Sequence, residues 1–340
     1  MRYLQRVSST AADADVALVT TTTAVETVPA CDLCGGTSFR HKRAWKDPLL
    51  FGPETWNLVM CEGCSLHFIN PRPTRAEIGR FYPQDYGAHT AKPSAPKKWH
   101  RRISSKDAAP PAFWERPLLH VRQNVSWYRF PTWQGEGHVL DIGCGSGGRY
   151  LDVLKGLGWT THGMDPSAHA IEAAKAKGHD AVVGMAEDNH FGDASMDVVT
   201  MWHVLEHCHS PAAALASCHR MLRPGGTLSL CVPNWGSLQA KTFGRWWWST
   251  DAPRHLYQFT RPTLTRYLEN AGFKVTSMSS RSGATSYQRA ARHFLNSLFG
   301  TKWQKDSSLA ISLADPWVAT MSLVRFLGVG AELRVVATKG

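Results

Sequence analysis

Glycine dominates a short segment that directly follows an apolar, strand-like run at residues 138–142. The segment reads Gly143-Cys-Gly145-Ser-Gly147-Gly148, and an apolar pattern at helical spacing comes after it. Glycines at a turn from strand to helix tolerate positive φ and let backbone N–H groups approach a ligand closely. The segment therefore predicts a ligand-binding turn. Because it also matches G-x-G-x-x-G, a nicotinamide or flavin dinucleotide is one candidate ligand.

Two aspartates narrow the choice of ligand. Asp141 ends the first strand, where its charge would repel a pyrophosphate and attract a cationic amino group. Asp165 ends the next strand, where a carboxylate accepts hydrogen bonds from both ribose hydroxyls. S-adenosylmethionine carries an amino group, a sulfonium and a ribose without a phosphate. It suits Asp141 better than a dinucleotide does, whereas Asp165 suits either ligand.

A polar segment follows the third predicted strand. It contains Ala186 and Glu187, whose backbone and carboxylate we expect to bracket an adenine ring. An ordinary polar loop is the alternative.

Three histidines stand where methyl transfer would need a base. His203 and His207 follow the fourth predicted strand, at the end of a sheet where doubly wound proteins bind ligands, and His255 lies in the loop region after the fifth. A histidine with a pKa near neutrality suits removal of a proton from an oxygen or carbon acceptor. We take all three as catalytic candidates, favour His255, and include His203 among the donor-binding residues. A structural role for His207 is the alternative.

Two C-x-x-C pairs stand near the start of the chain. Cys31 and Cys34 form one pair and Cys61 and Cys64 the other, in a segment too small for a core of its own. Each pair can clamp one side of a tetrahedral Zn²⁺, and four thiolates leave no open position on the metal. The spacing predicts a zinc ribbon with structural zinc. A redox pair or incidental buried cysteines are the alternatives.

Strand-like and helix-like segments alternate through the rest of the chain. This alternation predicts an α/β fold with a Rossmann-like parallel sheet covered on both faces. A helix over 167–177 is capped by Ser167 and stopped by Gly178. Strands are expected at 138–142, 160–164, 180–184, 196–202, 227–232, 273–279 and 333–338, the last of them antiparallel.

The chain divides into four segments. We expect a mobile tail at 1–28, a zinc-ribbon module at 29–75, a helical and linker region at 76–135, and a catalytic domain at 136–340. Thr74 and Glu77 have the spacing of a capping box, which predicts the start of a short helix. Residues 88–111 have the Pro-, Lys-, Ser- and Ala-rich composition of a linker.

Composition sets bounds on the partners. The 340 residues carry a formal net charge of +11, which favours anionic partners. Basic residues gather at 40–46 and 97–106, as a solvated linker or a nucleic-acid footprint would require. No segment reads as a signal peptide or as a membrane span of about 18 apolar residues, so we expect a cytoplasmic protein. The interrupted apolar stretch at 309–330 suggests a sheet cover or peripheral contact with a membrane.

Three adjacent tryptophans, Trp246, Trp247 and Trp248, cannot all face one core on a regular element. We expect at least one to be exposed and to line an acceptor pocket, stack on a sugar or rest at a membrane interface. A lid packed wholly against the sheet is the alternative.

The motifs from residue 139 onwards resemble those of class I S-adenosylmethionine-dependent methyltransferases. The matching segments are Val139-Leu-Asp-Ile-Gly-Cys-Gly-Ser-Gly147, Gly163-Met-Asp165, Met185-Ala-Glu187, Met196-Asp-Val-Val-Thr-Met-Trp-His-Val-Leu-Glu-His207 and Leu222-Arg-Pro-Gly-Gly-Thr-Leu228. The resemblance implies a seven-stranded sheet whose last strand is antiparallel. It also implies that Asp141 and the turn from Gly143 to Gly147 face the methionine part, Asp165 the ribose, and Ala186 and Glu187 the adenine.

Two further segments resemble parts of related enzymes. The paired cysteines, followed by Asn70-Pro-Arg-Pro and Phe81-Tyr-Pro-Gln-Asp-Tyr86, resemble an N-terminal zinc module of bacterial methyltransferases associated with polysaccharide or secondary-metabolite pathways. The segment from Asp251 to Phe259 resembles a D-x-P-R-H-L-x-x-F segment of related methyltransferases. Glu206-His207 resembles the Glu-His pair of ubiquinone-biosynthesis O-methyltransferases, some of which use a divalent ion. This chain has His203 where their pattern has an acid, which puts a metal at that position in doubt.

These observations predict an enzyme that transfers a methyl group from S-adenosylmethionine to a hydroxyl or carbon of a small molecule, a sugar or a lipid-linked glycan. A nucleic-acid modifying or binding protein is the alternative that the zinc ribbon and basic linker would serve. Against it, the segment after the fourth strand lacks the Asn/Asp-Pro-Pro-Tyr pattern of base N-methyltransferases. The sequence leaves the acceptor atom and the oligomeric state open.

Overall fold

The computed structural model describes residues 23–46, 54–82, 95–109, 111–126, 128–148, 150–188, 190–281 and 329–340. It divides into two compact units. The first, here called the cysteine unit, comprises Met1–Tyr82, Pro233–Arg266 and Ser279–Leu333. The second, here called the sheet unit, comprises Pro83–Val232, Tyr267–Met278 and Arg334–Gly340.

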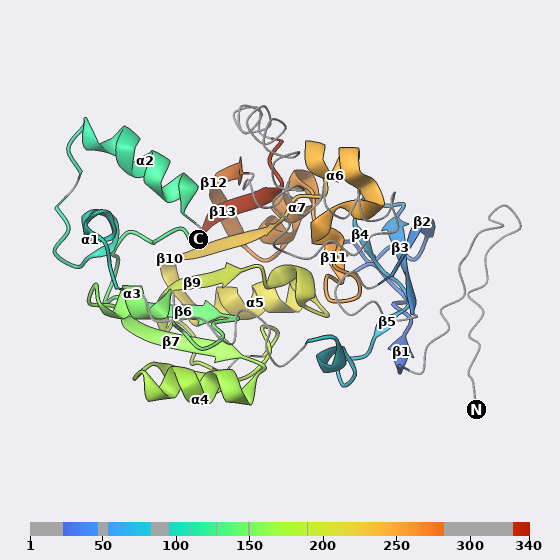
Figure 1. Cartoon of the computed structure of the whole chain (residues 1–340), viewed down its shortest axis with the longest axis horizontal. Coiled ribbons are helices and arrows are strands. Elements are labelled where there is room, and N and C mark those ends of the chain that lie inside the picture. Colours follow the sequence, from blue (N-terminus) through green and yellow to red (C-terminus); the bar gives the residue numbers. More distant parts are fainter. Residues whose placement is uncertain are drawn as a thin grey trace, which may run out of the picture. The chain divides into compact units, whose positions relative to one another are not determined.

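A seven-stranded sheet in the order β12-β13-β10-β9-β6-β7-β8 forms the largest element of the structure (Figure 1). Strand β6 pairs in parallel with both β7 and β9, β9 pairs in parallel with β10, and β13 is antiparallel. This arrangement confirms the predicted fold class. The bounds are β6 His138–Ile142, β7 Thr160–Asp165, β8 Asp180–Val183, β9 Met196–Trp202, β10 Leu222–Pro233, β12 Phe273–Arg281 and β13 Glu332–Lys339.

Helices of the sheet unit follow the strands as the alternation of the sequence predicts. Ser167 caps α4 by accepting a hydrogen bond from the Ala170 N–H, and Ser210 caps α5 in the same way. Each cap satisfies one of the backbone N–H groups that the first turn of a helix leaves without a partner. The helices are α1 Lys98–Ser104, α2 Glu115–Val125, α3 Leu151–Lys155, α4 Ala168–Ala176, α5 Pro211–Met221 and α7 Arg261–Asn270, of which only the residues from Tyr267 onwards belong to this unit.

The core beside β6 consists of aliphatic and aromatic side chains from strands and helices. Val139 and Val198 come from neighbouring strands, and Leu154 comes from α3; all three side chains are fully buried. Phe130, Tyr150, Val153, Leu157 and Trp159 complete the cluster. Burial of these side chains fixes the register of β6, and with it the position of the glycine-rich turn that follows.

The cysteine unit is built from short antiparallel strands and a distant segment of the chain. Its larger sheet has the order β11-β4-β3-β2, and β1 pairs with β5 in a second, two-stranded sheet. Strand β11 comes from the segment that follows β10, far along the chain. The bounds are β1 Val25–Glu26, β2 Phe39–Lys46, β3 Thr55–Cys61, β4 His67–Ile69, β5 Arg72–Pro73, η1 Ile78–Phe81, α6 Leu238–Phe243, η3 Gly244–Trp246, η4 Trp248–Thr250 and β11 Tyr257–Gln258.

Several local expectations differ from the structure. Most of the expected tail, residues 1–28, lies outside the described residues, but Val25–Glu26 forms β1 because it pairs with β5. The expected linker contains α1, since Trp159 Nε1 donates a hydrogen bond to the Ser104 backbone oxygen at 2.6 Å and fixes the end of that helix. Thr74 and Glu77 form no capping box: the backbone oxygen of Thr74 accepts from Glu77 N and a 3₁₀ helix begins at Ile78.

Residues 233–266 fell within the expected catalytic domain, but they cluster with the N-terminal residues in the cysteine unit. Of the three adjacent tryptophans, Trp247 is buried and Trp246 is half-buried. The stretch at 309–328 lies outside the described residues. Among those described, no helix combines the length and hydropathy that crossing a bilayer requires.

Candidate functional site

The glycine-rich turn has the backbone that its sequence predicts. Gly143, Gly145 and Gly147 adopt φ values of +73°, +51° and +69°. A Cβ at Gly143 would lie 2.4 Å from Cγ2 of Val204, and one at Gly147 would lie 2.9 Å from Cδ2 of His179. Larger residues at these two positions would therefore strain the backbone and clash, so the turn requires glycine.

Asp165 holds this turn against the end of the neighbouring strand. Its Oδ2 accepts a hydrogen bond from Gly145 N, and its Oδ1 accepts one from Ser167 N, both at 2.9 Å. The backbone oxygen of Met164 accepts from Gly143 N at 2.7 Å. Asp165 thus orders the glycine turn and the start of α4 at once. The sequence identified the residue but gave no sign of this second task.

Asp141 is a buried carboxyl group at the end of β6. Its Oδ1 accepts a hydrogen bond from Thr200 Oγ1 at 2.6 Å. Burial raises the pKa of Asp141 to about 8, and the charge of Asp165 adds to the rise, while the bond from Thr200 opposes it. A cationic group bound beside Asp141 would favour its ionised form.

Lys177, directly after α4, braces the glycine turn, and His179 joins α3 to β7 next to it. Lys177 Nζ donates a hydrogen bond to the Ser146 backbone oxygen at 2.6 Å. The His179 ring lies between Asp152, 2.9 Å from its Nε2, and Thr161, 2.8 Å from its Nδ1. No local pattern marks Lys177 or His179 as part of the site, because both contacts join segments that are separate in the sequence.

Ala186 and Glu187 lie in the turn after β8. Ala186 is buried, and Glu187 Oε1 accepts hydrogen bonds from His209 N at 2.8 Å and Ser210 N at 3.2 Å. Glu187 therefore holds the N-terminal end of α5 in place. Its expected role at the adenine remains a prediction.

His203 lies between a carboxylate and a thiol. Its Nδ1 is 3.2 Å from Glu206 Oε1 and its Nε2 is 3.6 Å from Cys231 Sγ. Burial opposes protonation of the ring, but Cys231 and Glu206 outweigh burial and hold the pKa of His203 well above its usual range. A ring that keeps its proton is suited to holding neighbouring groups in place rather than to accepting a proton.

The expected donor-site residues follow strands that are neighbours in the sheet. Asp141 lies at the end of β6 and the glycine turn follows that strand. Asp165 ends β7, Ala186 and Glu187 follow β8, and His203 follows β9, in the sheet order β9-β6-β7-β8. Parallel strands bring their carboxyl ends to one edge, where α/β proteins bind ligands. His207 ends the 3₁₀ helix η2, Leu205–His207, after the same β9.

His255 belongs to the cysteine unit, in a segment fixed by ion pairs and backbone contacts. Its Nδ1 lies 2.8 Å from the Ser249 backbone oxygen, which can only accept, so the neutral ring carries its proton on Nδ1. Nε2 then has the lone pair and lies 3.8 Å from Asp251 Oδ2. Arg254, which is fully buried, donates to both carboxylate oxygens of Asp251 and to the Phe81 backbone oxygen.

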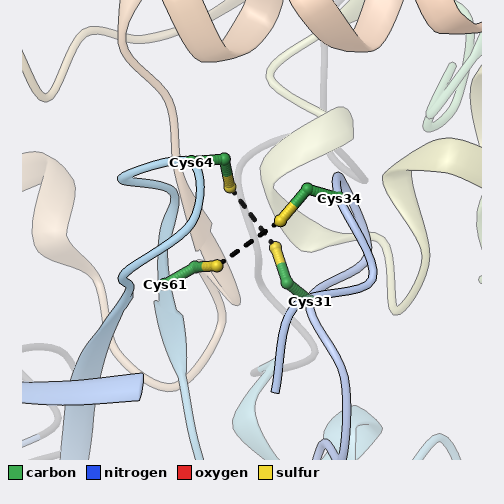
Figure 2. Close-up of side chains that lie close together, drawn as sticks. All are labelled: Cys31, Cys34, Cys61 and Cys64. Carbon is green, nitrogen blue, oxygen red and sulfur yellow. Dashed lines mark hydrogen bonds between the residues drawn. The ribbon is translucent and has the colours of Figure 1, made fainter. Parts of the chain in front are cut away.

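The four cysteines near the N-terminus converge from two turns of the chain (Figure 2). Cys31 Sγ lies 3.6 Å from Cys64 Sγ, and Cys34 Sγ lies 3.5 Å from Cys61 Sγ. Tetrahedral zinc with Zn–S distances of about 2.3 Å requires sulfurs about 3.8 Å apart. The donor set and its spacing fit Zn²⁺.

Burial raises the pKa of Cys31 and, to about 11, that of Cys64. At Cys34 the effect of burial is outweighed by the backbone N–H of Gly36 and by Cys61, which hold the pKa below its usual value. A metal ion would therefore displace protons from Cys31 and Cys64 as it binds.

Residues 101–278, just over half of the 340-residue chain, match the family model described as methyltransferase domain. The chain belongs to this methyltransferase family. Membership agrees with the predicted enzyme class and with S-adenosylmethionine as the methyl donor. The match ends before β13 and leaves most of the cysteine unit outside it.

Two curated relatives and a solved structure are similar to this methyltransferase-family chain. The ubiquinone biosynthesis O-methyltransferase of Thiobacillus denitrificans is 39% identical over 97 residues, which cover 26% of this chain and 40% of that protein. A probable S-adenosylmethionine-dependent methyltransferase of Mycolicibacterium smegmatis is 29% identical over 178 residues, covering 49% of this chain and 67% of that protein. A solved S-adenosylmethionine-dependent methyltransferase from Archaeoglobus fulgidus is 21% identical, covers 66% of this chain and 91% of that one, and has a TM-score of 0.43.

Proposed function

We propose that this protein transfers a methyl group from S-adenosylmethionine to a hydroxyl group of a small molecule. The observation that carries the proposal is the glycine turn held by Asp165, with the buried carboxyl group of Asp141 at the end of the adjacent strand. The amino group of an amino acid would stabilise the carboxylate form of Asp141 as its counter-charge, whereas a pyrophosphate would keep Asp141 protonated and find no counter-charge there.

S-adenosylmethionine supplies an already activated methyl group on a sulfonium. Catalysis then consists mainly of aligning the acceptor, the methyl and the sulfur, which is worth up to about 7–11 kcal/mol in favourable cases. In this proposal Asp141 and the turn from Gly143 to Gly147 hold the amino-acid end of the donor, and Asp165 holds the ribose. Ala186 and Glu187 border the adenine.

A hydroxyl acceptor must lose a proton during the transfer, and we assign this step to Nε2 of His255. The hydrogen bond from Nδ1 to the Ser249 backbone oxygen supports the assignment, because it keeps the lone pair on Nε2 in the neutral ring. His203, whose pKa Cys231 and Glu206 raise, serves in this proposal to position the loop after β9. His207 either takes part in catalysis or holds the loop in place, and single-turnover kinetics of a His207 variant distinguish the two roles.

The choice of oxygen as the acceptor atom rests on the name of one relative. The relative from Thiobacillus denitrificans is named for an O-methyltransferase reaction, which supports oxygen as the acceptor atom here. A sugar or a lipid-linked glycan offers the same kind of hydroxyl group as other small molecules. Methylation at carbon would leave the need for a base unchanged.

We also propose that Cys31, Cys34, Cys61 and Cys64 bind one structural Zn²⁺. The spacing of the four sulfurs supports this role, and four thiolates leave no coordination position for a substrate. The ion would hold together the turn before β2 and the turn between β3 and β4.

Calorimetry against S-adenosylhomocysteine and NAD tests the donor. We expect S-adenosylhomocysteine to bind and to raise the melting temperature, and NAD to do neither. The Asp165→Ala variant should bind S-adenosylhomocysteine more weakly, because the ribose partner and the hydrogen bond to Gly145 N are both lost. Stabilisation by NAD in place of S-adenosylhomocysteine would refute the proposal. A mass-spectrometric screen of hydroxylated acceptors then identifies the product.

A further inference from the structure

An exposed apolar patch lies at the beginning of helix α2 in the sheet unit. Phe113, Trp114 and Leu118 are 81%, 77% and 54% exposed, and they are three of the four large apolar side chains that stand out as exposed among the described residues. Trp114 and Leu118 are four residues apart and so share one side of the helix. Leu119, on another side, is buried. The patch is therefore the outward side of a helix whose other side packs against the protein.

Hydrogen bonds hold the C-terminal end of helix α2 in place. Arg334 donates from its guanidinium to the backbone oxygens of Gln123 and Ser126, at 3.1 and 2.6 Å. The Gln123 side chain both donates to and accepts from the Phe130 backbone, at 2.7 and 3.0 Å. These bonds fix the C-terminal half of the helix, so the apolar side chains at its other end are presented on an ordered element.

Positive charge predominates in the chain segment that contains the patch. Residues 95–126 contain seven lysines and arginines and two acids, Asp107 and Glu115. Glu115 is already paired with Arg102, which joins α2 to α1. The exposed cations are Lys97, Lys98, Arg101, Lys106, Arg116 and Arg122. Aromatic and aliphatic side chains with a basic border are typical of helices that lie at the surface of an anionic membrane.

We propose that Phe113, Trp114 and Leu118 insert into the interface of an anionic lipid membrane, with the lysines and arginines of α1 and α2 on the lipid headgroups. Tryptophan is well suited to this depth, since its ring is apolar and its N–H is polar. A second copy of the chain is a poorer occupant, because a two-fold contact would bring the two basic borders together. This docking surface does not depend on the identity of the proposed acceptor. It would bring the enzyme close to any acceptor that lies in a membrane.

Co-sedimentation of the full chain with lipid vesicles tests the proposal. We expect the protein to bind vesicles of phosphatidylcholine with phosphatidylglycerol, and to bind vesicles of phosphatidylcholine alone much more weakly. Binding should weaken as salt is added, because the electrostatic part is screened.

Two sets of variants separate the apolar and electrostatic contributions. The triple variant Phe113→Ser, Trp114→Ser and Leu118→Ser should lose at least about tenfold in vesicle binding. The triple variant Lys98→Gln, Arg101→Gln and Lys106→Gln should lose about fivefold for each charge removed. The matched control is Val183→Ser, which replaces an apolar residue that is 50% exposed on β8 and should bind vesicles like the unmodified protein.

Three results would overturn the proposal. One is failure of the unmodified protein to bind the anionic vesicles at low salt. Another is unchanged binding by the apolar triple variant with an unchanged melting temperature. The third is a dimer in light scattering that the apolar triple variant converts to a monomer, which would assign the patch to a second copy of the chain.

Discussion

Tyr257 lies opposite Phe68 in an antiparallel pair of strands, although the two residues are far apart in the sequence. Their rings are 5.9 Å apart, Ile69 N donates to the Leu256 backbone oxygen at 2.9 Å, and Arg72 donates to the Tyr257 hydroxyl at 3.1 Å. His255 immediately precedes this pairing. The strand that follows one turn of the cysteine cluster therefore supports the backbone next to the proposed base.

Because of this support, loss of the proposed zinc should destabilise β11 as well as the strands next to the cysteines. Removing the metal with a chelator, or replacing Cys61 by serine, should expose the backbone amides of β3, β4 and β11 together to hydrogen exchange. The physical reason is that β11 has β4 as its strand partner, and β4 follows directly after Cys64. Hydrogen exchange followed by mass spectrometry measures this.

S-adenosylhomocysteine binding provides the control for the zinc experiment. The predicted donor residues lie in the sheet unit, so their ligand should still bind after chelation. Protection of β11 that persists while β3 and β4 exchange would contradict the prediction. Replacement of Cys218, a buried cysteine of α5, by serine is the matched control, since it should leave exchange in β11 unchanged.

Donor binding should depend on pH through Asp141. The pKa of this carboxyl group, about 8, means that the ligand-free protein keeps it protonated at neutral pH. A cationic amino group favours the carboxylate, so binding should release a proton. The affinity for S-adenosylhomocysteine should rise by up to about tenfold per pH unit on approach to pH 8.

Calorimetry in buffers of different ionisation enthalpy measures the released proton, and Asp141→Asn should abolish both the release and the pH dependence.

The stability of the fold depends on the pH in the opposite direction to donor affinity. The folded pKa lies above the unfolded value of about 3.9, so the fold loses stability as pH rises between the two values. The asparagine variant should lose that part of the pH dependence. An unchanged pH profile in the variant would exclude Asp141 as the titrating group.

Lys177 should matter to the donor although no motif contains it. The Lys177→Met variant loses the hydrogen bond to the Ser146 backbone oxygen, one strong contact that braces the glycine turn. A charged hydrogen bond of this kind contributes about 1.5–3 kcal/mol, so we expect roughly tenfold or greater loss of donor affinity. Lys175→Met, on an exposed side of the same helix, is the matched control. Equal donor affinity in the two variants would show that the brace is unimportant.

Replacement of His255 tests the proposed base. Asparagine can still donate to the Ser249 backbone oxygen but has no group that accepts a proton near neutrality. Turnover of a hydroxyl acceptor should fall about 10²–10⁴-fold in His255→Asn, with donor affinity unchanged. Single-turnover kinetics and calorimetry measure the two quantities separately. The exposed His169, replaced by asparagine, is the control, and turnover equal to that of the unmodified protein would remove His255 from the catalytic residues.

The strand positions and the glycine turn could be read from the sequence because both are local patterns. A buried parallel strand is a short apolar run, as at 138–142, and a turn with positive φ selects glycine, as at Gly143. The two C-x-x-C pairs likewise record the geometry of a tetrahedral site in their spacing. Fold class and the identity of the candidate residues followed from these patterns.

Tertiary structure alone decided what those residues contact. Three contacts join segments that are distant in the sequence. They are the pairing of β11 with β4, the bond from Lys177 to Ser146, and the bond from Trp159 to Ser104 at the end of α1. Periodicity reports which side of an element is apolar, but it does not report which neighbour covers that side. For the adjacent Leu118 and Leu119 of α2, only the structure shows that Leu119 is buried and Leu118 exposed. The free energy that selects such neighbours comes from burial and hydrogen bonds between distant segments, and a single local pattern holds no record of it.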